Sequence, residues 1–362
     1  MLRVRRRDFL KSLPALAAAP SVLSEVDGRL LAQAPAGPLI PVRALNHMTL
    51  SVSDPKRSID FYQGLFGMPV QARQGPTTLL RIGAGPQFLA ISGTGANAAP
   101  SINHFCLTTD NFDADRALTA LAKVGVTRAE GAGGGLSGGP LKARVRMRGP
   151  ESGGAPGGTP ELYFGDPDGI VVQLQDTRYC GGSGVPGNAC GSPEPSPKKG
   201  LLAVRDLSHF TITATDAARS NKFYQDLFGL EVQARQGPNA PLLGVGTGVQ
   251  FLMFTGGAGA GRAGAPAAPP RPASINHVCM NMDVFKPDDI LKTLEGYGIK
   301  PRGNTQGPAG PMVSYVSMRM ENRGGAKEGT PELYFTDPDG LLSQLQDVKY
   351  CGGSGYLGDQ CP

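Results

Sequence analysis

The 362-residue sequence contains no tryptophan and only four histidines. Its charges nearly balance once residues 1–34 are set aside, because that stretch holds six of the 35 basic residues and only three of the 30 acidic ones. A nearly neutral chain lacks the positive surface that binds nucleic acid or an anionic membrane. The apolar residues 12–23 form a short run broken by Pro14 and Pro20, which argues against a stable membrane anchor. The oligomeric state stays open.

The N-terminus combines a cluster of arginines with a mildly apolar stretch. Arg5, Arg6 and Arg7 precede Phe9 and Leu10, and the small residues Ala32 and Ala34 follow. This arrangement resembles a twin-arginine (Tat) export signal with a cleavage site near residue 34. The alternative is a basic disordered tail. We expect residues 1–34 to engage the Tat export machinery and the mature protein to be periplasmic or secreted.

An internal repeat organises the rest of the chain. The string TPELYFGDPDGIVVQLQDTRYC at residues 159–180 returns as TPELYFTDPDGLLSQLQDVKYC at residues 330–351. The repeat predicts two related domains, at residues 43–190 and 203–362, with linkers at 35–42 and 191–202. The abundance of glycine (52) and proline (32) favours strands and turns over long helices.

Each repeated string predicts a β-hairpin, because Asp-Pro-Asp-Gly has the residues that tight turns need. Counting back from a three-residue loop places Tyr163 opposite Gln173. Side chains alternate along a strand, so Gln173 shares its face with Val171 and Gln175. One face of the hairpin is therefore polar and the other is apolar.

The remaining sequence of each domain predicts two βαβββ modules. In the first module a strand at 45–52 precedes a helix that Asp54 caps and Gly67 ends, and strands follow near 70–74, 78–82 and 87–92. In the second, a strand at 102–108 and a helix at 113–124 precede a strand at 141–148 and the hairpin. The second domain repeats this order and adds a Gly/Ala/Pro-rich insertion at 256–272, predicted to be a surface loop.

The four histidines are His47, His104, His209 and His277, and each lies on the first strand of a module. A single histidine on a strand is usually structural. Four at equivalent positions instead indicate paired metal ligands.

These features together resemble the vicinal oxygen chelate (VOC) superfamily, which includes glyoxalase I, extradiol dioxygenases and bleomycin-resistance proteins. The resemblance rests on the paired βαβββ modules, their histidines, the string FYQxLFG at 61–67 and 223–229, and a polar residue four places after DPDG. It implies an α+β fold of tandem VOC domains, in which the modules form a curled mixed sheet around a cleft.

The resemblance also implies a site in each domain. Its expected metal ligands are His47, His104 and Gln173 in the first domain, and His209, His277 and Gln344 in the second. Fe²⁺ or Mn²⁺ is the expected ion, with Zn²⁺ and Ni²⁺ as alternatives. Glutamine stands at both positions where extradiol dioxygenases have glutamate, which leaves the charge of the metal uncompensated. Tyr163 and Tyr334 match the position of an active-site tyrosine, or simply pack beneath the hairpin.

Several other residues are candidates for the same sites. Arg73, Arg235, Cys106 and Cys279 are candidate substrate-binding residues, although each cysteine could equally be a plain buried thiol. Glu161 and Glu332 are additional carboxylates that could serve as a metal ligand or a base if their strands curl inward. The alternating Lys142, Arg144, Arg146 and Arg148 form either a solvated sheet face or one wall of a site for an anionic ligand. We predict local disulfides between Cys180 and Cys190 and between Cys351 and Cys361.

Two functional hypotheses follow. The first is an exported metal-dependent lyase, isomerase or dioxygenase of the VOC type, in which a metal binds two neighbouring oxygens of a small substrate. The second is a non-catalytic small-molecule binding protein of the bleomycin-resistance type, which the two glutamines favour.

Overall fold

A computed structural model describes residues 37–362 apart from 96–97, 238–239, 257–271 and 304–308. The predicted signal at 1–34 and most of the predicted insertion at 256–272 therefore lie outside the described residues. Residues 38–362 form one compact unit. No helix within the described ranges is both long and apolar enough to cross a membrane.

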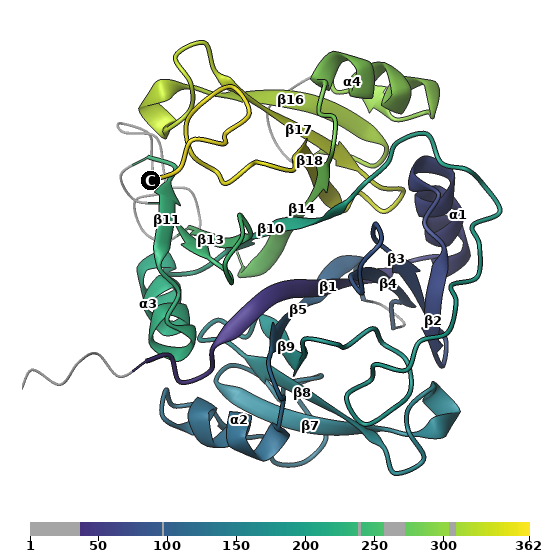
Figure 1. Ribbon diagram of the computed structural model, residues 1–362, viewed down its shortest axis with the longest axis vertical. Coiled ribbons are helices and arrows are strands. Elements are labelled where there is room, and N and C mark those ends of the chain that lie inside the picture. Colours follow the sequence, from purple (N-terminus) through teal and green to yellow (C-terminus); the bar gives the residue numbers. More distant parts are fainter. Residues whose placement is uncertain (1–36, 96–97, 238–239, 257–271, 304–308) are drawn as a thin grey trace, which may run out of the picture. The chain divides into compact units, whose positions relative to one another are not determined.

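The chain forms two nine-stranded mixed sheets that repeat one order of elements (Figure 1). The first half comprises β1 (Val42–Val52), α1 (Pro55–Phe66), β2 (Val70–Gln74), β3 (Thr77–Arg81), β4 (Phe88–Gly93), β5 (Ser101–Thr109), α2 (Ala114–Ala122), β6 (Thr127–Arg128), β7 (Lys142–Arg148), η1 (Pro150–Ser152), β8 (Thr159–Gly165) and β9 (Val171–Asp176). The second half comprises β10 (Asp206–Thr213), α3 (Ala217–Phe228), β11 (Val232–Arg235), β12 (Pro241–Gly244), β13 (Phe251–Thr255), β14 (Ser274–Met282), α4 (Pro287–Gly296), β15 (Lys300–Pro301), β16 (Val313–Arg319), η2 (Glu321–Arg323), β17 (Thr330–Thr336) and β18 (Leu342–Asp347).

The tandem α+β architecture predicted from the repeat is confirmed. The strand order of the first sheet is β2-β3-β4-β1-β5-β9-β8-β7-β6, and the second sheet repeats it. β1 pairs with β5, and β10 pairs with β14, so the two modules of each half join within that half. The two-residue strands β6 and β15 were not expected.

Local signals set the ends of α1 and α3 as predicted, whereas α2 ends at Ala122, two residues before the predicted end. The Asp54 carboxylate accepts the backbone N–H of Arg57 over 3.1 Å, which caps α1. Gly67 ends α1 in the left-handed region (φ 66°), where a side chain would also collide with the backbone of Lys199. Asp216 and Gly229 do the same for α3.

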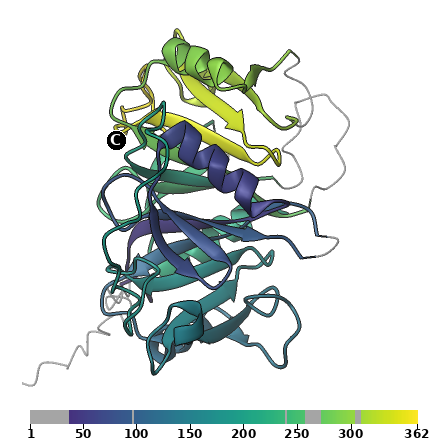
Figure 2. The same ribbon diagram turned by 90° about the vertical axis from the view of Figure 1, so that its right-hand side faces the viewer.

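The first helix of each half packs against the DPDG hairpin of the other half. Figure 2 shows α1 beside the yellow strands of the second half. Tyr62 of α1 donates to Asp337 over 3.2 Å, and Arg57 forms a 2.6 Å ion pair with Asp339. Tyr224 of α3 likewise donates to Asp166. The two halves therefore share one apolar core.

Candidate metal centre

The site residues of the first half lie in one row across five strands. Direct cross-strand neighbours are Phe88 and His47, His47 and Cys106, Cys106 and Gln173, and Gln173 and Tyr163. The hairpin register therefore has Tyr163 opposite Gln173, as the turn predicts. Cross-strand neighbours share a face of the sheet, and residues two places apart on a strand do too. His104 lies two places before Cys106 on β5 and is therefore on the same face.

Three potential ligand atoms converge on this face. The side-chain oxygen of Gln173 lies 3.0 Å from Nε2 of His47 and 3.2 Å from Nε2 of His104. All three side chains are at most 5% exposed. The structure thus brings together the three residues predicted to ligate a metal in the first half.

The hydrogen bonds of Asn46 determine which nitrogen of His47 carries the hydrogen. The amide nitrogen of Asn46 donates to the carbonyl oxygen of Tyr179 over 2.9 Å. Its oxygen must then face His47 and accept the hydrogen of Nδ1, at 2.8 Å. Nε2 of His47 therefore presents a lone pair toward Gln173, provided that the ring is neutral.

Asn103 faces His104 as Asn46 faces His47, but its amide nitrogen donates to the hydroxyl of Ser51 over 3.3 Å rather than to a carbonyl. The side-chain oxygen of Asn103 accepts from Nδ1 of His104 over 2.8 Å. Nε2 of His104 then carries a lone pair, and the hydroxyl of Thr49 lies 3.2 Å from it. In both histidines the nitrogen that faces Gln173 is the one able to bind a metal.

Burial keeps both rings neutral. Loss of solvent lowers the pKa of His47 well below its ordinary value, and the neighbouring His104 lowers it further. Loss of solvent also lowers the pKa of His104, to about 4. Neutral imidazole is the form that ligates metals, so the site is ready for a cation near neutral pH.

The second half repeats the arrangement with one difference. Nε2 of His277 lies 3.0 Å from the side-chain oxygen of Gln344, and Nδ1 of His277 donates to Asn276. His209 lies beside His277, with ring centroids 5.6 Å apart. Nδ1 of His209 faces the hydroxyl of Ser208, at 3.1 Å. A hydroxyl can donate or accept, so Ser208 does not select one tautomer as Asn46 does.

The donor set suits a divalent cation that accepts nitrogen and oxygen ligands. In the first half the Gln173 oxygen and the two Nε2 atoms converge, with the Thr49 hydroxyl beside Nε2 of His104. The amide nitrogens of Gln173 and Gln344 have no hydrogen-bond partner among the described residues. Across those same residues no group of three His, Cys, Asp or Glu side chains could hold a metal. The glutamine oxygen is therefore indispensable to any three-ligand site here.

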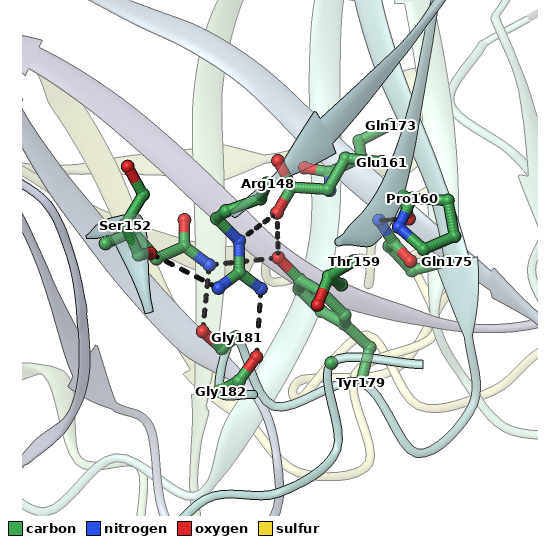
Figure 3. Close-up of polar contacts among 12 residues, drawn as sticks. Arg148, Ser152, Thr159, Pro160, Glu161, Gln173, Gln175, Tyr179, Gly181 and Gly182 are labelled. Carbon is green, nitrogen blue, oxygen red and sulfur yellow. Dashed lines mark hydrogen bonds and ion pairs between the residues drawn. The ribbon is translucent and has the colours of Figure 1, made fainter. Parts of the chain in front are cut away.

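Glu161 is committed to a buried network and is not a spare ligand (Figure 3). Its carboxylate forms a 2.6 Å ion pair with Arg148 and accepts the hydroxyls of Tyr163 and Tyr179 at 3.1 and 2.9 Å. Arg148 also donates to the carbonyl of Gly182. Glu332 is held in the same way by Arg319, Tyr334 and Tyr350. The proposed role of Glu161 and Glu332 as ligand or base is not supported by these contacts.

The profile of the Glyoxalase/Bleomycin resistance protein/Dioxygenase superfamily matches residues 44–174 and again residues 206–345. The chain belongs to this superfamily. Both matched segments end at the hairpin strands β9 and β18, so each includes its two histidines and its glutamine.

Solved structures of similar fold include glyoxalases and extradiol dioxygenases. The Mn(II)-bound glyoxalase from Novosphingobium aromaticivorans has 15% identity and a TM-score of 0.54, covering 84% of this chain and 82% of its own. A catechol 2,3-dioxygenase has 16% identity and a TM-score of 0.52, covering 87% and 88%. An extradiol ring-cleaving dioxygenase from B. fuscum has 17% identity and a TM-score of 0.54, covering 86% and 74%. None of the curated proteins compared matches the chain. At these identities the likeness shows the VOC fold alone.

The remaining candidates lie at different distances from the histidines. Arg73 and Arg235 are exposed on the edge strands β2 and β11, and Arg73 pairs with Glu194 over 2.6 Å. The structure does not bring them to the metal ligands. Cys106 and Cys279 are fully buried beside the ligands, and burial raises the pKa of each thiol well above its ordinary value. The two predicted disulfides, Cys180–Cys190 and Cys351–Cys361, are confirmed.

The sequence reasoning missed the residues that hold the ligands in place. An asparagine directly precedes three of the four histidines, at 46, 103 and 276, and a serine precedes the fourth. That pattern was readable from the sequence. Tyr179 and Tyr350 were also missed, although both lie in the repeated string that defined the two halves.

Proposed function

We propose that this VOC protein is a metal-dependent enzyme of the glyoxalase or extradiol dioxygenase type that acts on a small substrate with vicinal oxygens. The observation that carries the proposal is the convergence of Nε2 of His47, Nε2 of His104 and the amide oxygen of Gln173 in the first half. In the second half Nε2 of His277 meets the amide oxygen of Gln344 beside the ring of His209. Buried lone pairs that face each other repel unless a cation or a donated hydrogen lies between them. The proposal is also supported by the Mn(II)-bound glyoxalase, a protein of the same fold that binds a metal.

His47, His104 and Gln173 would hold the metal in the first half, and His209, His277 and Gln344 in the second. Fe²⁺ or Mn²⁺ suits the nitrogen and oxygen donors best, with Zn²⁺ and Ni²⁺ as alternatives. A metal bound there with open coordination positions supplies Lewis-acid chemistry toward the substrate oxygens. The protein contributes the fixed orientation of its ligands, through Asn46, Asn103 and Asn276.

Tyr163 and Tyr334 would face the substrate as neutral phenols. Burial, and then the charge of Glu161, raises the pKa of Tyr163 well above its ordinary value. Because the Tyr163 hydroxyl donates to Glu161, its oxygen is left to accept a hydrogen bond from the substrate. Tyr334 donates to Glu332 in the same manner.

Metal analysis of the purified protein tests this function. The chain, expressed with its own N-terminus and purified without chelators, is expected to contain up to two divalent metals by mass spectrometry. His47→Ala and His209→Ala should each remove the metal of one half, whereas Arg73→Ala, far from the ligands, should remove none. Folded wild-type protein that contains no metal and takes up none on addition of Mn²⁺ or Fe²⁺ would contradict the proposal.

A non-catalytic binding protein is the second candidate, and the glutamines favour it. Rotating the Gln173 amide by half a turn would direct its nitrogen at both histidines, and its two hydrogens would satisfy both lone pairs without a metal. A glutamate could not do this in its ionised form. Metal-free protein that binds small molecules but turns over none would support this candidate.

We also propose that the protein is exported by the Tat pathway to the periplasm or beyond. The arginines at positions 5–7 and the two disulfides support export, because disulfides persist mainly in oxidising compartments. Replacing Arg5, Arg6 and Arg7 by lysine should retain the protein in the cytoplasm on cell fractionation. Unchanged export of that variant would count against the Tat route.

A further inference from the structure

The strand that adjoins the hairpin differs between the two halves on the face that carries the metal ligands. In β7, Arg144 is the direct neighbour of Tyr163, and Arg146 is the direct neighbour of Glu161. In β16 the corresponding neighbours of Tyr334 and Glu332 are Tyr315 and Ser317. Direct neighbours share a face, so these residues border the two sites.

The β7 face carries three basic side chains, Lys142, Arg144 and Arg146, and none of them forms an ion pair with a carboxylate among the described residues. Lys142 donates to Thr127 over 2.9 Å, and Arg144 donates to the carbonyls of Gly131, Gly133 and Gly135. Arg146 is exposed and has no hydrogen bond or ion pair with any described residue. The nearest carboxylate on this face, that of Glu161, is already bound by Arg148.

Arg146 also lies close enough to act on the first site. Burial raises the pKa of Tyr163, as does the charge of Glu161, and the positive charge of Arg146 is the contribution that opposes them. An anionic group held by Arg146 would therefore lie beside the Tyr163 hydroxyl. Lys142, Arg144 and Arg146 have neutral partners or none among the described residues, so their positive charge attracts an anionic group toward the site from a distance.

The β16 face is aromatic instead. The ring of Tyr315 stacks on that of Tyr334, with centroids 5.1 Å apart and an angle of 19°. The guanidinium of Arg302 covers Tyr315 at 5.1 Å from its centroid. Val313 and Ser317 occupy the places of Lys142 and Arg146. This face offers two stacked rings and one guanidinium that lies over Tyr315, where the first half offers three basic side chains.

We propose that the two halves select different substrates. The first half takes a vicinal-oxygen compound that also carries a carboxylate, and Arg146 binds that carboxylate. The second half takes an uncharged compound whose apolar or aromatic body packs near Tyr315 and Tyr334. The choice of vicinal-oxygen compounds rests on the metal-dependent function proposed above. The difference in charge selection does not, because it follows only from the different side chains of β7 and β16.

Calorimetric binding of two matched probes tests it. The probes are 3,4-dihydroxybenzoate, which carries a carboxylate, and catechol, which does not. His277→Ala removes the second metal site and so leaves only the first, whereas His104→Ala leaves only the second. Each variant is loaded with Mn²⁺, and its metal content is measured before the titration. In the first background, Arg146→Ser should weaken dihydroxybenzoate roughly 10-fold to 100-fold, the effect of losing one charge-assisted hydrogen bond, and leave catechol almost unchanged.

The reciprocal variant provides the control. Ser317→Arg, in the background that keeps the second site, should strengthen dihydroxybenzoate by a similar factor and leave catechol unaffected. Equal effects of Arg146→Ser on both probes, or no effect on either, would overturn the proposal. If the protein binds no Mn²⁺, the proposed function fails, and benzoate and phenol replace the probes on metal-free wild-type and Arg146→Ser protein. A benzoate affinity that does not depend on Arg146 would then overturn charge selection as well.

Discussion

The side-chain oxygen of Asn46 accepts the Nδ1 hydrogen of His47 over 2.8 Å, while the amide nitrogen of Asn46 donates to the carbonyl of Tyr179. The next residue, Cys180, begins a disulfide-closed loop. One metal-ligand candidate is thus fixed to a covalently constrained segment. In the second half Ser208 takes the place of Asn46, and among the described residues it forms no hydrogen bond with the carbonyl of Tyr350.

The first prediction concerns the hydrogen bond between Asn46 and His47. Asn46→Ser should lower the Mn²⁺ affinity of the first site by roughly 10-fold to 100-fold, because the histidine loses the partner that selects its tautomer. Ser208→Asn should raise the affinity of the second site. Isothermal titration of single-site proteins measures both. Equal Mn²⁺ affinity of Asn46→Ser and its parent would show that Asn46 does not position His47.

A second prediction concerns the missing negative charge. Gln173→Glu should raise the Mn²⁺ affinity of the first site by roughly tenfold or more, because a carboxylate compensates part of the metal charge. Gln344→Glu should do the same only for the second site, so each variant serves as the other's control. An unchanged or lower Mn²⁺ affinity in both variants would show that the glutamine oxygens are not ligands.

The buried ion pair of Arg148 and Glu161 gives a stability prediction. Both side chains are at most 2% exposed. Arg148→Met should lower the free energy of unfolding by about 3–5 kcal/mol, because it leaves the Glu161 carboxylate buried without its cation. The double variant Arg148→Met/Glu161→Leu should lose less, because no unpaired charge remains. Urea denaturation measures each value, and a double variant less stable than the single one would contradict this explanation.

Stability should also depend on pH through Asp166 and Asp337, which accept the tyrosine hydroxyls of the opposite half. Burial raises the pKa of each from 3.8 to about 6. Between those values the folded protein holds more protons than the unfolded chain, so the contribution is complete below pH 3.8 and is lost as the pH rises through about 6.

The loss should be on the order of 3 kcal/mol for each carboxyl group. Asp166→Asn/Asp337→Asn should remove this decline while keeping side chains of the same size. Chemical denaturation of both proteins at several pH values from 4 to 7 provides the comparison. Parallel stability curves for the two proteins would show that these carboxyls remain ionised throughout.

Much of the fold was predictable because its signals are local. The capping residues Asp54 and Asp216 and the DPDG turns each act over a few positions, and the repeat shows that both halves carry the same local signals. The packing of α1 on the opposite hairpin was not predictable, because the contact between Tyr62 and Asp337 joins residues far apart in the sequence. The pairing of β1 with β5, rather than with a strand of the other half, depends on the same long-range packing.

The sequence predicted the candidate metal ligands, but not the residues whose hydrogen bonds hold those ligands in place. Histidines and glutamines at repeated positions indicated the metal centre, and the turn gave Tyr163 its place. Arg148 alternates with three other basic residues in the sequence, and nothing local distinguishes it as the one that is buried in an ion pair with Glu161. Arg73 lies in the string QARQGP, which occurs at 71–76 and again at 233–238, and in the first half this string forms the edge strand β2 and the turn after it.

The most direct test of the metal centre is a titration of chelator-treated protein with Mn²⁺, followed by the electron paramagnetic resonance signal of free Mn²⁺. The disulfides require that no reductant be present. We expect wild-type protein to remove two equivalents of Mn²⁺ from solution, His47→Ala to remove one, and His47→Ala/His209→Ala to remove none while keeping its circular dichroism spectrum. Folded wild-type protein that leaves all added Mn²⁺ free, and likewise all Fe²⁺ in a parallel titration, would contradict the central claim.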